Sequence, residues 1–425
     1  MYKFEPSELM KELHKKYFER YVLPNFYHEI YSVIPNKESK KEPRETWYSR
    51  FHDEKKLFDC FMRNCSRHWE VLAVGEFDEL EKFYSDNESL IEQIGNADKK
   101  TWNNLLSEIF GYEKFEKESE WNCIKQQLIE EYDKENKYNY RYSPAVGDAF
   151  LHEYDMLFHN NVTKELCIHK NLEWFKNTVA DKMILCIKKA DFERFASRFR
   201  IWTPYTFALL SEVRVCPYCN RQFISPVLTK DGKSRADIDH FLPKGIYPYF
   251  AMSLYNWIPS CKTCNSSLKL ARKFDFIDLH PYRDNIGDYF YYSIKIKGDN
   301  ESGTFVSADT IIEDEACQHH LNIFKLRELA EFHSDLVQSL VQRRLCYSEQ
   351  YIEDLVQSDI NLYHTKDEMK AGILGYVPNK KSINNTILGK MKYDIAVQLG
   401  FIDDEEDRKL LEKIRRLVYK EDAYG

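Results

Sequence analysis

The sequence contains two Cys-x-x-Cys pairs, and no other feature of the chain restricts its fold as strongly. The pairs are Cys216/Cys219 and Cys261/Cys264, with 41 residues between them. Together they supply the four thiolates of a tetrahedral zinc ion, and a site filled by four protein ligands is structural rather than catalytic. A redox Cys-x-x-Cys motif is the alternative, but it leaves the second matching pair unexplained. We therefore expect one structural zinc ion, with a long segment inserted between its two binding turns.

The other seven cysteines follow no metal-binding pattern, and their odd number argues against a disulfide framework. They are Cys60, Cys65, Cys123, Cys167, Cys186, Cys317 and Cys346. We expect free thiols in a reducing compartment. The N-terminal residues 1–5 lack a signal-peptide core, and no apolar run approaches the roughly 18 residues that a membrane span needs. The expected location is therefore cytoplasmic, without a membrane partner.

The segment between the two pairs carries residues suited to phosphodiester hydrolysis. His240 can take a proton from water, because imidazole titrates near neutral pH. Asp239 and Asn265 offer the hard oxygen ligands that Mg²⁺ prefers. Adjacent residues of a strand face opposite sides, so Asp239 and His240 can act together only at a strand end or bulge. An ordinary surface Asp-His pair is the alternative.

The motifs together resemble a known family. The strings Cys-Pro-Tyr-Cys, Asp-His-Phe-Leu-Pro-Lys and Asn-Trp-Ile-Pro-Ser-Cys-Lys-Thr-Cys-Asn are similar to the HNH endonucleases. More narrowly, they resemble the zinc-containing HNH nucleases of bacterial anti-phage systems of the Septu and retron-associated types. The resemblance covers residues 210–285 and implies a ββα-metal motif, in which a β-hairpin and a helix hold one catalytic Mg²⁺ or Mn²⁺ ion.

The resemblance also implies roles for single residues. His240 is the general base, Asp239 is a metal ligand, and Asn256 hydrogen-bonds the backbone and holds the catalytic loop in shape. Asn265 stands at the third position, where the name-giving pattern has histidine, and is still expected to reach the metal. Whether Asn265 or His280 completes the coordination stays open.

Basic residues near these motifs are candidates for binding the phosphate backbone. They are Lys244, Lys269, Arg272 and Lys273. The net charge of −8 disfavours a protein coated in basic surface. Between residues 212 and 284, however, eleven Lys and Arg face seven Asp and Glu, so this segment carries +4 and the remainder −12. Ordinary solvated side chains are the alternative for each of these residues.

The fold class that we predict is mainly α with a small α+β insert. Three domains are expected: a helical scaffold or sensing domain over 1–200, the zinc-stapled HNH domain over 201–285, and a β-hairpin with helices over 286–425. Alternation predicts the hairpin over 289–297 and 304–312. Apolar periodicity predicts helices after Ser7, over 55–74, 77–94, 102–110, 121–134, 146–158, 171–195, 202–213, 261–272, 317–358, 386–399 and 404–419.

The function that we predict is a divalent-metal-dependent endonuclease that hydrolyses nucleic-acid phosphodiester bonds, with DNA favoured over RNA. By resemblance it is an effector of bacterial anti-phage defence, which allows a partner ATPase or sensor protein. Two alternatives remain open. One is a non-catalytic zinc module that binds nucleic acid or a protein partner. The other is a toxin-like HNH nuclease that cleaves RNA or transfer RNA.

Overall fold

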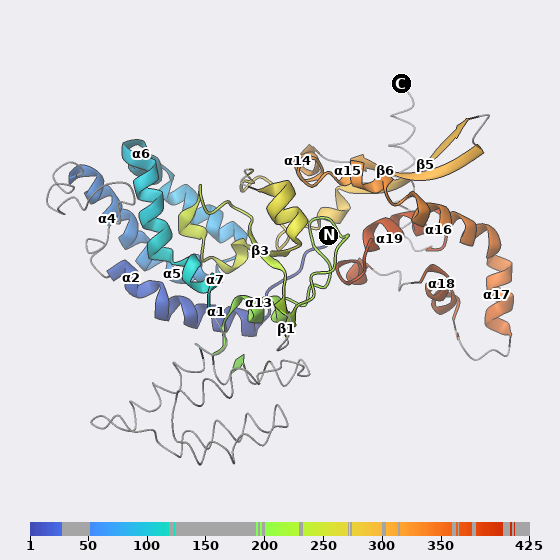
Figure 1. The fold of residues 1–425 in the computed structure, drawn as a ribbon, viewed down its shortest axis with the longest axis horizontal. Helices are drawn as coiled ribbons and strands as arrows, with labels where there is room; N and C mark the ends of the chain where they lie inside the picture. Colours follow the sequence, from blue (N-terminus) through green and yellow to red (C-terminus); the bar gives the residue numbers. More distant parts are fainter. Residues whose placement is uncertain are drawn as a thin grey trace, which may run out of the picture. The chain divides into compact units, whose positions relative to one another are not determined.

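The computed structural model shows a mainly helical chain with small antiparallel sheets, as predicted (Figure 1). Contacts divide it into two units. Unit 1 comprises Met1–Phe4, Val213–Ile224 and Ile258–Gly425, and unit 2 comprises Glu5–Glu212 and Ser225–Trp257. The structure describes residues 1–27, 52–118, 123, 193, 196–197, 200–228, 233–270, 272, 274–299, 303–312, 315–358, 363, 365–375, 380–402, 409 and 412.

This division follows contacts rather than chain order. The segment 201–285, expected to form one domain, contributes residues to both units. The four cysteines of the two pairs belong to unit 1, whereas Asp239 and His240 belong to unit 2. The predicted boundaries near residues 200 and 285 do not coincide with the division into units.

The helices of unit 2 begin and end close to the predicted positions. They are α1 (Glu8–Tyr21), α2 (Leu23–Tyr27), α4 (His52–Arg67), α5 (Trp69–Val74), α6 (Phe77–Phe110), α7 (Tyr112–Glu116) and α13 (Pro204–Leu210). Ser7 caps α1, because its Oγ accepts a hydrogen bond from the Met10 N–H at 3.3 Å. The predicted helices over 121–134, 146–158 and 171–195 fall almost entirely outside the described residues.

Helix α6 corrects one prediction, since the two helices expected over 77–94 and 102–110 form one continuous helix of 34 residues. Its start is fixed by a capping box between Glu76 and Glu79. Gly95 lies inside it, where a glycine costs about 1 kcal/mol relative to alanine but does not end the helix. Gly111 ends it with a left-handed φ of 66°, a conformation that glycine adopts without strain.

The inserted segment adds short elements to unit 2. They are β1 (Val227–Leu228), β2 (Lys233–Ser234), β3 (Asp237–His240), and the 3₁₀ turns η3 (Pro248–Phe250) and η4 (Leu254–Asn256). Strand β1 pairs antiparallel with β2. Strand β3 forms a two-stranded sheet with β4 (Trp257–Ser260), and the boundary between the units falls within β4. Helix α6 packs on α4 and on η3, so the N-terminal helices support the insert.

A buried histidine joins helix α1 to the insert. The Nε2 of His14 lies 2.8 Å from the Met252 carbonyl, and its Nδ1 accepts a hydrogen bond of 3.0 Å from the Trp202 indole N–H. Both ring nitrogens are therefore used by the neutral tautomer, with Nε2 as the donor. Burial lowers the pKa of His14 to about 4. Protonation would place a charge in this apolar site and break the bond from Trp202.

Unit 2 is expected to lose stability as the pH falls from about 6.5 to about 4. In this window His14 protonates in the unfolded chain but resists protonation when folded. The free energy of unfolding therefore decreases as the pH decreases. The contribution is about 3 kcal/mol in full. The described tryptophans, Trp69, Trp102, Trp202 and Trp257, all belong to unit 2, so urea unfolding followed by tryptophan fluorescence reports on this unit. His14→Gln, which cannot titrate, should show a smaller loss between pH 7 and pH 4.5, and an equal loss would contradict the assignment.

Unit 1 contains the predicted β-hairpin, which is confirmed. Strand β5 (Phe290–Asp299) pairs antiparallel with β6 (Gly303–Ile312), with Ile294 opposite Ala308. Helices and turns complete the unit: η5 (Thr263–Lys269), η6 (Ile286–Asp288), α14 (Glu315–Phe324), α15 (Leu326–Glu331), α16 (Ser334–Cys346), α17 (Glu349–Gln357), α18 (Lys366–Leu374), η7 (Lys380–Asn385) and α19 (Gly389–Gln398). The helices expected over 317–358 are present as α14 to α17. Lys325, with a left-handed φ of 54°, separates α14 from α15.

Two helices were predicted at the C-terminal end, over 386–399 and 404–419. The helix expected over 386–399 is present as α19, which begins three residues later than predicted. The helix expected over 404–419 falls almost entirely outside the described residues.

Helix α19 covers the free edge of strand β5. The Tyr292 N–H donates to Asp394 Oδ2 at 3.0 Å, and the Ile294 N–H donates to Gln398 Oε1 at 3.0 Å. Lys390 Nζ pairs with Asp394 Oδ1 at 2.7 Å, and both side chains are buried. Asp394 and Gln398, one helical turn apart on α19, thereby accept hydrogen bonds from backbone N–H groups that a neighbouring strand would otherwise bond.

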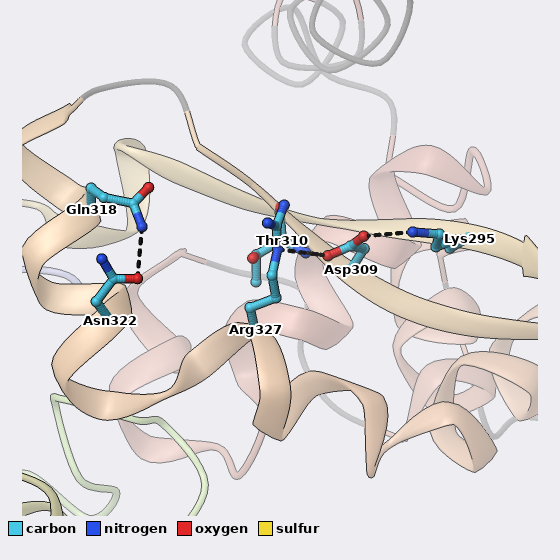
Figure 2. Close-up of polar contacts among 6 residues, drawn as sticks. All are labelled: Lys295, Asp309, Thr310, Gln318, Asn322 and Arg327. Atoms are coloured by element: carbon cyan, nitrogen blue, oxygen red, sulfur yellow. Dashed lines mark hydrogen bonds and ion pairs between the residues drawn. The ribbon is translucent and has the colours of Figure 1, made fainter. Parts of the chain in front are cut away.

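On β6, a carboxylate ties the hairpin to helix α15 (Figure 2). Asp309 accepts hydrogen bonds from Lys295 and Arg327, each at 3.1 Å, and Arg327 also donates to the Thr310 carbonyl at 3.0 Å. Burial alone would raise the pKa of Asp309, but these partners outweigh it and leave the pKa lowered. Lys295 and Arg327 are more than half exposed, so each ion pair contributes at most about 1 kcal/mol.

Candidate functional site

The four cysteines of the two pairs come together in unit 1. Their sulfur atoms all lie within 4.8 Å of one another, and all four residues are buried. The Cys219 and Cys261 sulfurs are 4.0 Å apart. A tetrahedron with zinc–sulfur bonds of about 2.3 Å has edges of about 3.8 Å. The cluster could therefore hold a metal ion such as zinc.

The first cysteine pair lies in a tight turn. An isolated antiparallel bridge joins Val215 and Phe223, and the Cys216 N–H donates to the Gln222 carbonyl at 2.9 Å. Asn220 closes the turn, with a left-handed φ of 52° and an N–H that donates to the Cys216 carbonyl at 2.8 Å. Asparagine tolerates this conformation better than most residues. The sequence Cys-Pro-Tyr-Cys-Asn thus aims both sulfurs to one side.

The second pair opens the π-helical turn η5. The N–H groups of Cys261 and Cys264 lie 3.4 Å from the sulfurs of Cys216 and Cys261, respectively. Burial raises the pKa of Cys216, whereas hydrogen bonds from neighbouring thiols, Cys216 first, lower the pKa of Cys261. Four thiolates so close together would repel one another in a buried site. A divalent cation removes that repulsion, so the donor set fits zinc.

Residues from the C-terminal region contact the turn that carries Cys216 and Cys219. His320 Nε2, on α14, lies 3.0 Å from the Tyr218 carbonyl, and the Tyr218 ring stacks on Phe324 at 4.4 Å. The buried Asn220 side chain donates to the Ile383 carbonyl at 2.8 Å and accepts from the Lys390 N–H at 2.9 Å. The four-cysteine cluster is therefore part of the packing of unit 1.

In unit 2, Asp239 and His240 lie at the end of β3, and both are buried. The Nε2 of His240 lies 2.9 Å from the Ala251 carbonyl, which also accepts a 2.8 Å hydrogen bond from the Trp257 indole N–H. A carbonyl can only accept, so Nε2 carries the proton and Nδ1 is the basic nitrogen. This contact fixes both the tautomer and the direction of the imidazole ring.

Asn256 braces the loop that follows His240. Its Oδ1 accepts a hydrogen bond from the Leu242 N–H at 2.7 Å. Its Nδ2 donates to the carbonyls of Leu242 at 3.1 Å and Phe250 at 2.9 Å. The side chain is completely buried, so water does not compete for these bonds. One amide thus spans both ends of the segment between His240 and Ala251.

The other two candidate ligands belong to unit 1. Asn265 is half-buried in η5, where its carbonyl accepts the Leu270 N–H at 3.0 Å in a five-residue, π-type hydrogen bond. The helix expected over 261–272 is therefore a shorter π-helix, a conformation frequent at functional sites. His280 is fully buried, and its Nδ1 accepts the Tyr282 N–H at 3.2 Å. Asp239 and Asn265 are in different units.

The basic candidates differ in exposure. Lys244 and Arg272 are exposed, as phosphate-binding residues must be. The phosphate-binding role predicted for Lys269 does not agree with its burial. The residue is only 1% exposed, and its ammonium lies 5.6 Å from the centre of the Phe274 ring. Lys269 therefore does not face solvent, where a phosphate backbone would have to reach it. Lys273 lies outside the described residues.

Two contributors to the surroundings of His240 were not predicted from the sequence. One is the carbonyl of Ala251, a backbone atom that no side-chain motif reveals. The other is Tyr112, whose ring lies 4.3 Å from that of His240 at an interplanar angle of 81°. Tyr112 is 128 residues away along the chain. The only signal was Gly111, which permits the turn that precedes it.

Comparisons with known proteins give little information. No family model matches the chain, and no solved structure matches it. Protein ea31 of Escherichia phage lambda is 30% identical over 138 residues, which cover 30% of this chain and 42% of that protein. The chain thus spans less than half of the length of this relative. Within the described residues, no helix combines the length and apolar character needed to cross a membrane.

Proposed function

We propose that the protein is an HNH-type endonuclease that hydrolyses phosphodiester bonds of nucleic acid with a divalent metal ion. The observation that carries the proposal is the fixed imidazole of His240. Its Nε2 is held by the Ala251 carbonyl, so Nδ1 is the nitrogen that can accept a proton. The buried carboxylate of Asp239 precedes it at the strand end, where both side chains can serve one site.

Each residue has a separate task in this proposal. The Nδ1 of His240 takes the proton of the attacking water, and Asn256 keeps the His240 loop in shape. Asp239 offers an oxygen ligand of the kind that would hold Mg²⁺ or Mn²⁺, since hard cations prefer carboxylate oxygens. When bound, that ion supplies positive charge for the phosphate and the leaving oxygen. The four cysteines hold a structural zinc ion, and the ββα-metal motif is part of the same proposal.

The wider setting is also proposed from the resemblance of the motifs. DNA is the favoured substrate, and the protein acts in the bacterial cytoplasm as an anti-phage effector, alone or with a partner ATPase or sensor protein. One competing function has an observation in its favour. The four-cysteine cluster by itself is sufficient for a zinc module that only binds nucleic acid or a protein. Such a module does not require His240.

His240→Ala is expected to lower the cleavage rate by about 10²- to 10⁴-fold, the usual contribution of a general base. The measurement is cleavage of plasmid DNA and of total RNA with Mg²⁺, Mn²⁺ or EDTA, with fragment ends tested for 5′-phosphate and 3′-hydroxyl. His319→Ala is the matched control, because His319 is partly exposed and pairs with Asp278 in unit 1. Cleavage that survives EDTA or the loss of His240 would exclude this mechanism, and folded protein that only binds would favour the zinc module.

A further inference from the structure

The ring of Tyr112 contacts two residues of the proposed nuclease centre. Its edge-to-face contact with His240 has a centroid distance of 4.3 Å. The ammonium of Lys244 lies over the same ring, 4.8 Å from its centre. All three residues belong to unit 2. The ring is buried, whereas Lys244 is exposed, so Tyr112 links an interior imidazole to a cation at the surface.

Tyr112 itself is held firmly. It is the first residue of α7 and follows Gly111, whose left-handed φ turns the chain sharply at the end of α6. Three residues later, Phe115 is fully buried and stacks on Trp257 at 4.6 Å. The Trp257 indole donates to the Ala251 carbonyl, the group that also orients His240. Helix α7 and the imidazole are therefore fixed by one aromatic frame.

The turn that carries Lys244 is fixed from the helical side as well. The N–H groups of Ile246 and Tyr247 both donate to the Pro243 carbonyl at 2.9 Å, which closes the turn. The Asn103 side chain, on α6, donates to the Gly245 carbonyl at 3.0 Å. An exposed lysine normally samples many rotamers, and a cation–π contact reduces that freedom. The fold thus limits where the ammonium of Lys244 can lie.

We propose that Tyr112 is a positioning residue, which holds Lys244 as a phosphate-binding cation beside His240. This inference rests on the proposed nuclease function. A lysine attracts a backbone phosphate whatever the base sequence. Because Lys244 is held beside the imidazole, the strand that it binds is aligned with His240, the general base. The helical N-terminal part of the chain, which has no catalytic motif of its own, thereby contributes to substrate alignment.

The inference predicts different effects for removing the ring and for removing the hydroxyl. Tyr112→Phe keeps both ring contacts and should cleave DNA like the wild type. Tyr112→Leu removes them and should lower kcat by about tenfold to a hundredfold, because small displacements of reacting groups have effects of that size. Lys244→Met should mainly raise KM, since it removes a phosphate contact and leaves His240 in place.

A binding measurement without the catalytic metal tests the same idea independently of catalysis. Binding of a short DNA duplex is measured without added Mg²⁺ or Mn²⁺ and without a chelator, so that the proposed zinc ion stays bound, over a range of NaCl concentrations, with an RNA duplex as a second arm. Lys244→Met should reduce the slope of log K against log salt by about 0.9, the value for one phosphate contact on duplex DNA. Tyr112→Leu should reduce it in the same direction, and Lys244→Arg should restore it.

The outcomes separate this inference from the proposed function. A folded wild type that neither cuts nor binds DNA or RNA overturns both. If His240→Ala abolishes cleavage but Tyr112→Leu keeps the wild-type kcat and salt slope, only the role of Tyr112 is wrong. Should Tyr112→Leu fail to fold, Lys244→Met decides: an unchanged salt slope overturns the inference, and a slope reduced by about 0.9 that Lys244→Arg restores supports it.

Discussion

Replacing Cys261 by serine is expected to abolish zinc binding and to unfold the part of unit 1 around the four cysteines. The sulfur of Cys261 lies 4.0 Å from that of Cys219 and accepts the Cys264 N–H, so its loss removes both a ligand and a contact between the turns. Structural zinc in small domains contributes roughly 10 kcal/mol or more of apparent free energy. That is comparable with the entire stability of a typical domain.

Zinc content by elemental analysis and hydrogen exchange of the peptides around the cluster measure this effect. The wild type should hold one zinc per chain, and Cys261→Ser should hold none and exchange rapidly over residues 213–224 and 258–270. Cys317→Ser makes the same chemical change at another fully buried cysteine of unit 1, outside the cluster. It should keep its zinc and lose only about 1–3 kcal/mol, the usual size of the cost of burying a polar group in place of an apolar one. A Cys261→Ser protein with a full zinc complement would contradict the four-cysteine assignment.

The four-cysteine cluster shows what a sequence can reveal. Its ligands are identifiable because each Cys-x-x-Cys pair is a local turn, and Asn220 supplies the left-handed residue that such a turn needs. The hairpin of β5 and β6 was equally local, and the ends of both strands were predicted within two residues. Helix boundaries failed where the reason was tertiary. Gly95 reads as a break but is tolerated in α6, and Lys325 reads as helical but adopts a left-handed φ.

The surroundings of His240 could not be predicted from the sequence in the same way. The residue itself stands out because an Asp-His pair lies between the two cysteine pairs. Its immediate partners are the Ala251 carbonyl and the Tyr112 ring, and neither belongs to a recognisable motif. Lys269 shows the opposite error. A lysine near the motifs reads as a phosphate ligand, yet the following chain folds back and Phe274 covers it. Contacts between distant segments decide both cases.

Asn256→Ala is expected to destabilise unit 2 strongly while leaving every charge in place. It removes three hydrogen bonds at once, and the backbone groups of Leu242 and Phe250 lose their partner in a site without water. An unsatisfied buried polar group costs about 1–3 kcal/mol. With three such groups the total is about 3–9 kcal/mol, before any relaxation of the loop. Such a loss would leave unit 2 marginally stable or unfolded.

Asn25→Ala is the matched control, because that amide also donates to two backbone carbonyls, those of Tyr21 at 3.0 Å and Ile109 at 2.8 Å. Asn25 is only half-buried, so water can replace it and the loss should be about 1 kcal/mol. Urea unfolding followed by tryptophan fluorescence reports on unit 2 for both variants. If the two losses were equal, Asn256 would be an ordinary buried amide. A much larger loss for Asn256→Ala would mean that the loop from His240 to Ala251 depends on this one side chain. The direction of the imidazole then depends on it too, because the Ala251 carbonyl that orients His240 lies at the end of that loop.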